Sequence, residues 1–294
     1  MAIILLMVVG DRTKAGDGSV DVVIGVVGTG IGAEIAQLAA QVGFKVVLKS
    51  RSRESLDKAF VRLSNKLLKV LSVGEKDKIL SRIDGVTAFK PLRECDIIIE
   101  AIIEDFKEKQ KLFAELDRIC PDETVFATNT SSLSVSALAS ATNRADRVVG
   151  MHFFNPPTKM RLVEVVRGDK TSAKTVEFIE RIARKMDKTT VVVNDTPCFI
   201  VNRMLMPQLN EAVLMLEEKI AKPEDIDAAA RLGLNHPMGP LALLDLIGLD
   251  VFVEIMDNLY ARTKNPKYKP AELAVRMVKE GRLGRKTKEG FYRY

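Results

Sequence analysis

The chain has 294 residues, of which 47% are hydrophobic and 29% charged, and its formal net charge is +6. This balance is typical of a globular protein and excludes a disordered chain, and the length is enough for one large or two medium domains. The basic residues are spread along the chain and not gathered in a tail. We therefore do not expect nucleic acid as a partner, although a basic surplus can attract an anionic small substrate.

Residues 1–20 read as an extension ahead of the folded chain. The opening MAIILLMVV is apolar but short, has no basic residues before it, and is followed at once by charged residues beginning at Asp11. We interpret this segment as a floppy or edge-strand extension, and not as a signal peptide or a membrane span. No other stretch is long and apolar enough to cross a bilayer, so no membrane association is expected.

Three cysteines are scattered along the chain without a CxxC pair or a metal-ligand spacing: Cys95, Cys120 and Cys198. An odd number of scattered cysteines is typical of a protein from a reducing compartment. We therefore expect a cytoplasmic protein without a metal site.

Short apolar runs rich in β-branched residues alternate with amphipathic stretches up to about residue 195. The predicted strands are 22–27, 45–48, 96–103, 124–128, 147–154 and 189–193, with amphipathic stretches such as 54–71 and 105–119 between them. Buried strands that alternate with helices predict a parallel sheet covered on both faces. The expected fold class is α/β, a Rossmann-like doubly wound sheet.

The strand signal disappears from about residue 200. The predicted helices there are 201–219, 223–232, 240–258 and 270–281, and proline-rich turns separate them. We therefore divide the chain into an extension at 1–20, a dinucleotide-binding domain at 21–195 and a helical domain at 196–294. The boundary is expected near Asp195-Thr196-Pro197.

The segment VVIGVVGTGIGAEIAQLAA, residues 22–40, reads as a strand, a glycine-rich turn and a helix. In a dinucleotide-binding loop, glycines let the backbone approach a pyrophosphate that lies at the N-terminus of the following helix. Gly28 and Gly30 suit the tight turn and the close approach, but the usual spacing Gly-x-Gly-x-x-Gly is absent. The third position is either Ala33, or Gly32 if one residue has been lost. A strand–turn–helix without a ligand is the plain alternative.

The predicted second strand ends in Leu48-Lys49-Ser50-Arg51-Ser52-Arg53, with no carboxylate before Glu54. In NAD sites an Asp or Glu at this point binds the ribose 2′-hydroxyl. A carboxylate would repel a 2′-phosphate, whereas serine, arginine and lysine can bind one through charge-assisted hydrogen bonds. We therefore expect Ser50, Arg51 and Arg53 to contact the cofactor and NADP to be preferred over NAD. A solvated basic turn is the alternative.

The chain has only two histidines, His152 and His236. His152 ends a predicted strand in GMHFFNPP, and ligands of open parallel sheets lie at the carboxyl ends of strands. A histidine there can accept a hydroxyl proton while hydride leaves the same carbon, and Glu164 in LVEVVR is the candidate to orient it. A core histidine bonded to a backbone carbonyl is the alternative. We interpret His236 as a turn or cap residue.

Two further polar positions are candidates for substrate contact. Ser131, in NTSSLS, follows the predicted strand TVFAT, where a hydroxyl can bind a substrate oxygen. Ser131 or Ser132 can equally cap the next helix. Asn202 lies in the apolar setting FIVNRM, where a buried amide needs partners and is either structural or within reach of a substrate.

Taken together, these blocks resemble a known family. GMHFFNPP, LVEVVR, EAIIEDFKEKQKLFAELD, ATNTSSLS, NDTPCFIVNR, HPMGPLALLDLIGLD and GRKTKEGFYRY are similar to the short-chain L-3-hydroxyacyl-CoA dehydrogenases, and most of all to the 3-hydroxybutyryl-CoA dehydrogenases. The resemblance covers about residues 21–294 and leaves residues 1–20 outside. It implies a dinucleotide-binding domain followed by a helical domain through which subunits form a homodimer.

The resemblance also implies an activity and a set of roles. The reaction is the reversible oxidation of (S)-3-hydroxyacyl-CoA, with 3-hydroxybutyryl-CoA as the expected substrate, to 3-oxoacyl-CoA. The family's His–Glu dyad falls on His152 and Glu164, and its contacts to the reacting oxygen fall on Ser131 and Asn202. Its contacts to the nicotinamide side of the cofactor fall on two residues of AIIEDFKEK, Glu104 and Lys109.

Three departures from the family pattern affect the expected site. Aligning the downstream IAQ places Gly32 on the third glycine and leaves the loop one residue short, so that Gly28, Gly30, Ile31 and Gly32 form it. The family's aspartate after the second strand is replaced by Ser50, in line with NADP. In NDTPCFIVNR a glycine is replaced by Cys198, whose side chain is expected to require a small backbone shift.

The acyl-CoA substrate carries phosphates that need cations. The amphipathic stretch after Arg53 offers four, each of which is equally compatible with a solvated helix face: Lys58, Arg62, Lys66 and Lys69. Two other functions remain open. One is a related dehydrogenase of a carrier-bound or free hydroxy acid. The other is a catalytically weak homologue that retains the fold, a reading motivated by the short glycine loop.

Overall fold

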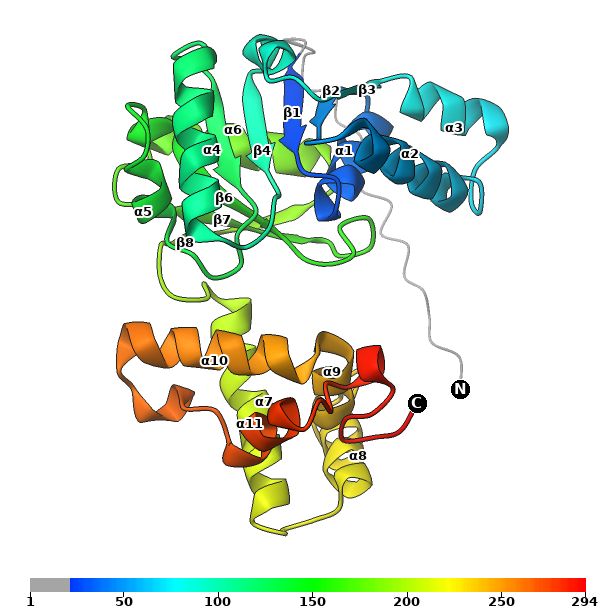
Figure 1. Ribbon diagram of the computed structural model, residues 1–294, viewed down its shortest axis with the longest axis vertical. Coiled ribbons are helices and arrows are strands. Elements are labelled where there is room, and N and C mark those ends of the chain that lie inside the picture. The colour runs from blue at the N-terminus through cyan, green and yellow to red at the C-terminus, as the bar shows by residue number, and fades with distance from the viewer. Residues whose placement is uncertain (1–21) are drawn as a thin grey trace, which may run out of the picture.

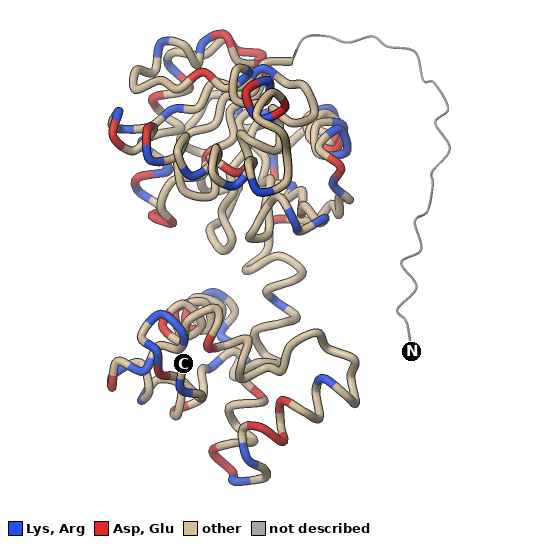
Figure 2. Tube along the Cα trace, turned by 90° about the vertical axis from the view of Figure 1, so that its right-hand side faces the viewer, with Lys and Arg blue, Asp and Glu red and all other residues tan. Residues whose placement is uncertain are grey.

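The computed structural model describes residues 22–294, and the prediction for residues 1–20 lies outside them. Figure 1 shows an α/β part above a helical part, with the start of helix α7 (Val201–Glu217) between them. Figure 2 shows that basic and acidic residues alternate along the trace of both parts. Among the described residues, no helix is long and apolar enough to cross a membrane, and no group of side chains is arranged to hold a metal ion.

The α/β part is built on one eight-stranded sheet in the order β3-β2-β1-β4-β5-β6-β7-β8. All neighbouring strands are parallel except β6 and β7, which are antiparallel. The strands are β1 (Val23–Val27), β2 (Lys45–Lys49), β3 (Ile83–Val86), β4 (Ile97–Glu100), β5 (Val125–Thr128), β6 (Val148–Phe153), β7 (Leu162–Arg167) and β8 (Thr189–Asn194).

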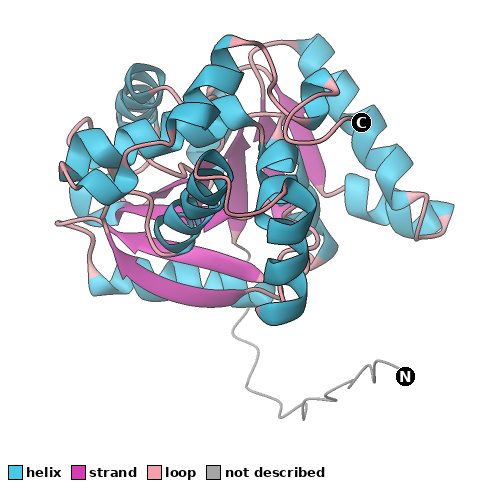
Figure 3. Cartoon of the chain, turned by 90° about the horizontal axis from the view of Figure 1, so that it is seen from below, coloured by secondary structure: helices cyan, strands magenta, loops and turns pink. Residues whose placement is uncertain are grey.

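Helices flank this sheet, as Figure 3 shows from below. The central strands are almost wholly buried, with runs such as Ile97–Ile99 at 0% exposure, because helices that shield both faces leave no side for polar residues. The helices of this part are α1 (Ile31–Gln41), α2 (Arg53–Leu67), α3 (Val73–Leu80), α4 (Phe106–Ile119), α5 (Val135–Ala139) and α6 (Ala173–Lys185). Short 3₁₀ helices occupy Lys90–Glu94 and Ala145–Arg147.

The strand order reverses at β1, which lies between β2 and β4. In open α/β sheets, ligands bind outside the carboxyl ends of the strands at such a switch point. The loops that leave β1, β2 and β4 therefore meet at one edge of the sheet, and this edge carries the glycine-rich turn.

The helical part has its own hydrophobic core, centred on residues of α7 and α10 such as Leu209, Val213 and Phe252. Its helices after α7 are α8 (Pro223–Gly233), α9 (Pro240–Ile247), α10 (Leu249–Thr263) and α11 (Glu272–Lys279), with 3₁₀ turns at Pro266–Tyr268 and Arg285–Thr287.

Two buried aspartates fasten the end of the chain to this core. Asp245 accepts hydrogen bonds from the amides of Phe291 and Tyr292. Asp227 accepts one from the hydroxyl of Tyr292 and two from the amides that begin α9. The closing GFYRY therefore completes the helical part, because its polar groups satisfy two buried carboxylates.

The structure confirms the predicted α/β class with a Rossmann-like sheet and a helical C-terminal region, and it differs in four details. The short β3 and the antiparallel β7 were not among the predicted strands. The predicted helix 240–258 is broken at Gly248, where φ is +101° and a β-carbon would meet Asp250. The predicted helix 54–71 ends at Leu67, and Ser72 then begins α3 with its own capping box.

Candidate active site

His152 and Glu164 form a buried pair across two strands. They are direct partners in the antiparallel register of β6 and β7, so their side chains project from the same face of the sheet. His152 Nδ1 lies 2.7 Å from Glu164 Oε2, and the two side chains are 5% and 1% exposed. Because an ionised carboxylate only accepts hydrogen bonds, Nδ1 carries the hydrogen and Nε2 of the neutral ring is left as an acceptor.

The second oxygen of Glu164 is bound by the start of the helical part. Oε1 accepts hydrogen bonds from the amides of Ile200 at 3.0 Å and Val201 at 2.9 Å, at the N-terminus of α7. Burial alone would raise the pKa of Glu164, but the hydrogen bond from His152 and those from the two amides outweigh it and hold the pKa below its ordinary value. Glu164 is thus an anion with both oxygens occupied.

Ser131 reaches the other nitrogen of the histidine. Its Oγ lies 3.1 Å from His152 Nε2, and with Nδ1 carrying the hydrogen this hydroxyl is the donor. The NTSS loop that carries Ser131 leaves the carboxyl end of β5, next to the end of β6 in the sheet. Two rings lie against the imidazole: Phe154 with its centroid 4.6 Å away and Phe199 with its centroid 5.6 Å away.

A partly buried ionic network supports this loop. Glu104 Oε1 accepts hydrogen bonds from the amides of Ser131 at 2.9 Å and Ser132 at 3.2 Å, while its Oε2 lies 3.3 Å from Lys109 Nζ. Burial would raise the pKa of Glu104, but the Lys109 ammonium and the hydrogen bonds from Thr130 and Ser131 lower it overall.

Lys109 itself is enclosed, with a side chain 1% exposed and Nζ 2.6 Å from Glu100 Oε1. Glu100 is fully buried at the end of β4 and also accepts a hydrogen bond from Thr128 at 2.6 Å. The structure thus places Lys109 between two carboxylates, where it holds Glu104 beneath the NTSS loop. Sequence reasoning did not single out Glu100, because a glutamate inside an apolar strand gives no signal of its partner.

Asn202 and Arg262 lie on the helical side of the site. Asn202 is half-buried in the first turn of α7, one residue after the amide that binds Glu164, and within residues 22–294 its side chain has no hydrogen-bond partner. Arg262, near the end of α10, donates to the carbonyl of Ser132 at 2.6 Å. This contact is a second link between the α/β part and the helical part. It was not expected from the sequence, since 130 residues separate Ser132 from Arg262.

The glycine-rich turn has the backbone of a dinucleotide loop. Gly28 has a φ of +119°, and a β-carbon there would lie 2.3 Å from the carbonyl oxygen of Ala101. Gly30 caps α1 without a side-chain hydrogen bond. A β-carbon on Gly32 would press against Val26 at 3.2 Å and Ala101 at 3.3 Å, so Gly32, and not Ala33, has the close helix–strand packing of the third glycine.

A cavity of about 650 Å³ opens beside this turn. Its walls come from the loops after β1, β2 and β4, and Gly28, Gly30, Ile31, Ser50, Arg51 and Ile102 are among the residues that line it. Nothing within the described residues bonds the amides of Gly30, Ile31 and Gly32, which lie at the start of α1. Free amides at a helix N-terminus beside a cavity of this size fit the pyrophosphate of a dinucleotide.

The residues of the basic turn after β2 differ in whether they line this cavity. Ser50 and the exposed Arg51 line the cavity, and so does Lys49, whose ammonium lies 3.8 Å from the centre of the Phe89 ring. Burial lowers the pKa of Lys49. Arg53 is not among the cavity-lining residues; it begins α2 and pairs with Asp57 at 3.1 Å. Lys49 and Phe89 are additional cavity residues that the sequence analysis did not assign.

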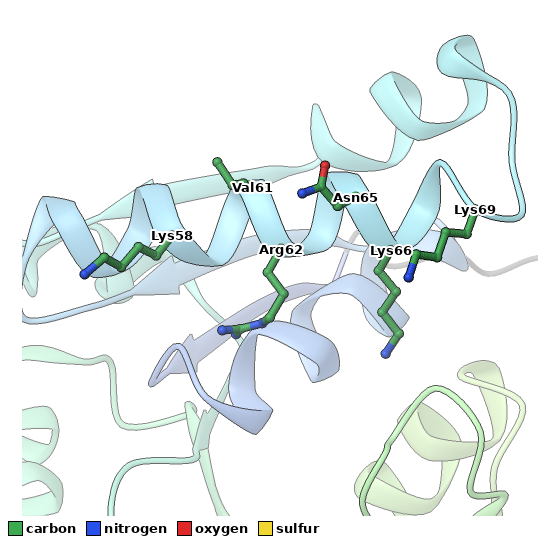
Figure 4. Close-up of a pocket in the computed structure, with 6 residues that line it drawn as sticks. All are labelled: Lys58, Val61, Arg62, Asn65, Lys66 and Lys69. Atoms are coloured by element: carbon green, nitrogen blue, oxygen red, sulfur yellow. The ribbon is translucent and has the colours of Figure 1, made fainter.

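A second hollow, of about 530 Å³, lies along α2 and is lined by Lys58, Val61, Arg62, Asn65, Lys66 and Lys69. Figure 4 shows Lys58 and Lys69 at opposite ends of the helix and Arg62 and Lys66 reaching toward α1. Lys66 pairs with Glu34 of α1 at 2.8 Å. All four expected cations, three from α2 and Lys69 just after it, therefore border one hollow.

Cys198 occupies the position at which a glycine was expected. It is buried, with a φ of +60°, and the following Phe199 also has a positive φ of +55°. Burial raises the pKa of the Cys198 thiol to about 11, so it is a neutral packing residue. The backbone keeps the left-handed conformation that suits glycine, and the side chain is accommodated at the cost of strain.

Comparison with protein families matches both parts of the chain. Residues 23–196 match the 3-hydroxyacyl-CoA dehydrogenase, NAD binding domain, and residues 199–294 match the 3-hydroxyacyl-CoA dehydrogenase, C-terminal domain. A 3-hydroxybutyryl-CoA dehydrogenase of Clostridioides difficile is 45% identical, with 92% of this chain and 99% of that protein covered. The mitochondrial hydroxyacyl-coenzyme A dehydrogenase of Homo sapiens is 42% identical, with 92% and 90% covered.

A solved structure agrees with these matches. The (S)-3-hydroxybutyryl-CoA dehydrogenase of Ralstonia eutropha superimposes with a TM-score of 0.91 at 42% identity, with 92% of this chain and 98% of that chain covered. Together the two family models match all of residues 23–294 except residues 197 and 198. The chain therefore belongs to the 3-hydroxyacyl-CoA dehydrogenase family.

Proposed function

We propose that this oxidoreductase interconverts (S)-3-hydroxyacyl-CoA and 3-oxoacyl-CoA, with 3-hydroxybutyryl-CoA as a substrate and His152 and Glu164 as its acid–base dyad. Family membership supports the reaction. The observation that supports the dyad is the buried His152–Glu164 pair, whose acceptor nitrogen, Nε2, is bonded by the hydroxyl of Ser131.

In the oxidation direction, His152 Nε2 accepts the proton of the 3-hydroxyl group. The imidazolium that forms keeps its Nδ1–H bond to Glu164, whose negative charge stabilises it. Glu164 remains ionised, because the amides of Ile200 and Val201 stabilise its negative charge through the other oxygen and help to keep its pKa low. In the reduction direction, the protonated His152 returns the proton to the carbonyl oxygen.

Ser131 and Asn202 are the proposed contacts of the reacting oxygen. The Ser131 hydroxyl lies 3.1 Å from His152 Nε2. A substrate oxygen that takes the place of this hydroxyl at Nε2 would therefore lie within reach of both His152 and Ser131. Asn202 has a side-chain amide without a partner among the described residues, on the helix turn next to the dyad. An amide without a partner at such a place is available to a substrate oxygen.

A nicotinamide cofactor, which the family model supports, accepts or supplies the hydride when bound. The residues that fit it are the turn Gly28, Gly30, Ile31 and Gly32, with its free amides. Glu104 lies beside Ser131, where a nicotinamide end would need to approach the base, and Lys109 keeps that carboxylate in place.

The proposed preference is for NADP. Ser50 and Arg51 line the cavity at the point where a carboxylate would bind an unphosphorylated ribose, and Lys49 adds a further cation. A 2′-phosphate gains charge-assisted hydrogen bonds from this set. Arg53, which pairs with Asp57, contributes at most to the local potential.

The α2 hollow is the proposed region for the phosphates of an acyl-CoA. Lys58 and Lys69 project from it with exposed side chains, and several cations along one helix face raise the local concentration of an anionic substrate. A cytoplasmic location, which the scattered cysteines predict, is in line with three buried, unpaired thiols.

We also propose a homodimer through the helical part. Four large apolar side chains of α7, α8 and the adjoining turns are exposed by 62–85%: Met204, Ile220, Leu232 and Leu234. They lie on the elements that border an apolar hollow of about 640 Å³. Exposed apolar surface around a hollow on one domain is typical of an interaction face, and a second copy of the chain is the partner that the family relationship favours.

The decisive experiment is a spectrophotometric assay with acetoacetyl-CoA, run with NADH and NADPH in parallel. Consumption of either reduced cofactor supports the reaction, and a higher kcat/KM with NADPH supports the cofactor preference. Turnover of free acetoacetate at the same rate would instead identify a dehydrogenase of free hydroxy acids. Cofactor binding without turnover of either substrate would identify the catalytically weak homologue and overturn the proposal.

A further inference from the structure

The glycine-rich turn is held from behind by a residue of a different helix. Arg62, on α2, directs one guanidinium nitrogen, Nη2, to two consecutive carbonyl oxygens of the turn: that of Thr29 at 2.5 Å and that of Gly30 at 3.3 Å. Figure 4 shows its side chain reaching from α2 toward the start of α1. The turn thus has an arginine on one side and the cofactor cavity on the other, since Arg62 does not line that cavity.

This contact determines where the amides of the turn point. In a trans peptide, the carbonyl and the N–H of one peptide plane point in opposite directions. The carbonyl of Thr29 shares its plane with the amide of Gly30, and the carbonyl of Gly30 shares its plane with the amide of Ile31. By binding both carbonyls, Arg62 turns both amides away from α2, and neither amide has another partner among the described residues.

A shortened loop needs such support. Gly30 has no side chain with which to cap α1, and its ψ of −113° lies outside the ordinary helix-cap range. One turn further along α2, Lys66 binds Glu34 in the first turn of α1 at 2.8 Å. Positions i and i+4 lie on the same face of a helix, so α2 holds both the turn and the helix that follows it.

We propose that Arg62 is a positioning residue for the cofactor pyrophosphate: it orients the amides of Gly30 and Ile31 toward the cavity and so replaces the rigidity that the missing loop residue would supply. The ligand class is any molecule with an adenosine diphosphate moiety. The inference rests on the cofactor site proposed above. It assigns Arg62 to the cofactor and not to the phosphates of an acyl-CoA, although Arg62 borders the α2 hollow.

The test compares Arg62→Met, which keeps the aliphatic stem and removes the donors, with the wild type. Arg118→Ala is the matched control, because Arg118 is also an exposed arginine that donates to a backbone carbonyl, but within α4. Dissociation constants for NADH, NADPH, ADP-ribose and AMP are measured by calorimetry. Thermal denaturation is recorded for each variant so that a folding defect is recognised.

We expect Arg62→Met to raise the Kd of NADH, NADPH and ADP-ribose by the same factor, about tenfold, as for the loss of hydrogen bonds from a charged donor. The Kd of AMP should change less than about twofold, because the pyrophosphate is the group that the amides bind. The KM of acetoacetyl-CoA at saturating cofactor should be unchanged. Arg62→Lys should recover only part of the affinity, because an ammonium is more strongly hydrated than a guanidinium and lies on a more flexible stem.

Three results would overturn the inference. An unchanged Kd of ADP-ribose would remove Arg62 from cofactor binding, and a raised KM of acetoacetyl-CoA alone would assign it to the acyl-CoA. Full recovery by Arg62→Lys together with loss of the effect at high salt would show direct attraction between charges and not positioning. Wild-type protein that binds ADP-ribose no more tightly than AMP would instead show that the proposed pyrophosphate site itself is wrong.

Discussion

Glu164 accepts a hydrogen bond from the amide of Val201 at 2.9 Å, and this contact ties the proposed base to the start of the helical part. The same carboxylate binds His152 through its other oxygen. The dyad is thus assembled from a strand pair in one part of the chain and a helix terminus in the other. The N-terminal end of α7 also stabilises the negative charge on Glu164, because helix dipoles favour anions at that end.

Replacement of His152 tests the dyad directly. We expect His152→Gln to lower kcat by at least about a hundredfold, because a general acid–base group is lost, while the Kd of the cofactor is nearly unchanged. His236→Gln is the control, since His236 lies beside the apolar hollow of the helical part. Steady-state rates and cofactor titrations give both quantities. Turnover close to that of the wild type in His152→Gln would exclude His152 from the mechanism.

The cofactor preference should depend on Ser50 and Arg51. We expect the ratio of kcat/KM for NADPH over NADH to exceed one and to decrease as salt rises, because partly exposed charge pairs are screened. Ser50→Asp combined with Arg51→Ala should shift the ratio toward NADH, because a carboxylate repels the 2′-phosphate and binds the ribose hydroxyls. Arg53→Ala is the matched control, since Arg53 is paired with Asp57. A ratio that favours NADH at low salt would show that the basic turn is only a solvated turn.

The pH dependence of stability should report the two carboxylates with lowered pKa values, Glu104 and Glu164. A group whose pKa is lower in the folded state contributes stability that is fully present above its unfolded value, here 4.5, and is lost as the pH falls through the folded value. Urea denaturation between about pH 7 and pH 3 should therefore show a decreasing midpoint from about pH 5 downward. Glu164→Gln should be less stable at pH 7 but lose less stability on acidification.

The control for this experiment is Glu254→Gln, a change at an exposed position of α10. In this variant, the urea denaturation midpoint should decrease below about pH 5 as it does in the wild type. An acid profile of Glu164→Gln that is parallel to that of the wild type would contradict the linkage between Glu164 and folding.

Backbone strain at Cys198 predicts that the difference in stability between a glycine and an alanine variant has opposite signs at Cys198 and at Cys120. Cys198 has a φ of +60°, whereas Cys120, which is also buried and unpaired, has a φ of −86°. At Cys198, glycine should be more stable than alanine by about 1 kcal/mol, because a left-handed backbone penalises a β-carbon. At Cys120, glycine should be less stable than alanine by about 0.5–1 kcal/mol. The denaturation midpoints of the four variants test this prediction. If alanine were more stable than glycine at both positions, the backbone at Cys198 would not be strained.

The proposed dimer face is tested by placing a charge on it. We expect light scattering to show a dimer of the wild type at micromolar concentration. Leu232→Glu should raise the dissociation constant of the dimer by at least about tenfold, because a buried charge without a partner is costly. Val70→Glu, at an apolar side chain that is 77% exposed in the α/β part, is the control and should remain dimeric. A monomeric wild type would contradict the proposal.

How far the sequence could predict the site depended on the distance between partners along the chain. The alternation of apolar runs placed His152 and Ser131 correctly at strand ends on one edge of the sheet, because parallel strands share that edge. The antiparallel β7 could not be predicted from periodicity, although it is the strand that puts Glu164 opposite His152. The identity of the orienting group was therefore inferred from its apolar neighbours and from family resemblance, without its geometry.

Contacts made by long side chains left no signal in the sequence. Arg62 lies 33 residues from the carbonyl of Thr29, and nothing in the helical pattern of α2 distinguishes it from its solvated neighbours. Lys109 was expected beside the cofactor, and the structure places it between Glu100 and Glu104 with 1% of its side chain exposed. Partner choice among such charges is decided by tertiary packing, which a single sequence does not encode locally.

The bonds from the last residues of the chain to Asp245 and Asp227 have a consequence for synthesis. The α/β part contains all of its strands by residue 194, so it can fold while the helical part is still being made, as N-terminal domains generally do. The helical part is different, because the amides of Phe291 and Tyr292 can satisfy Asp245 only after residues 291 and 292 have left the ribosome. Completion of the helical part, and with it of the helix terminus that holds Glu164, thus requires every residue up to Tyr292, whereas the sheet requires none beyond residue 194.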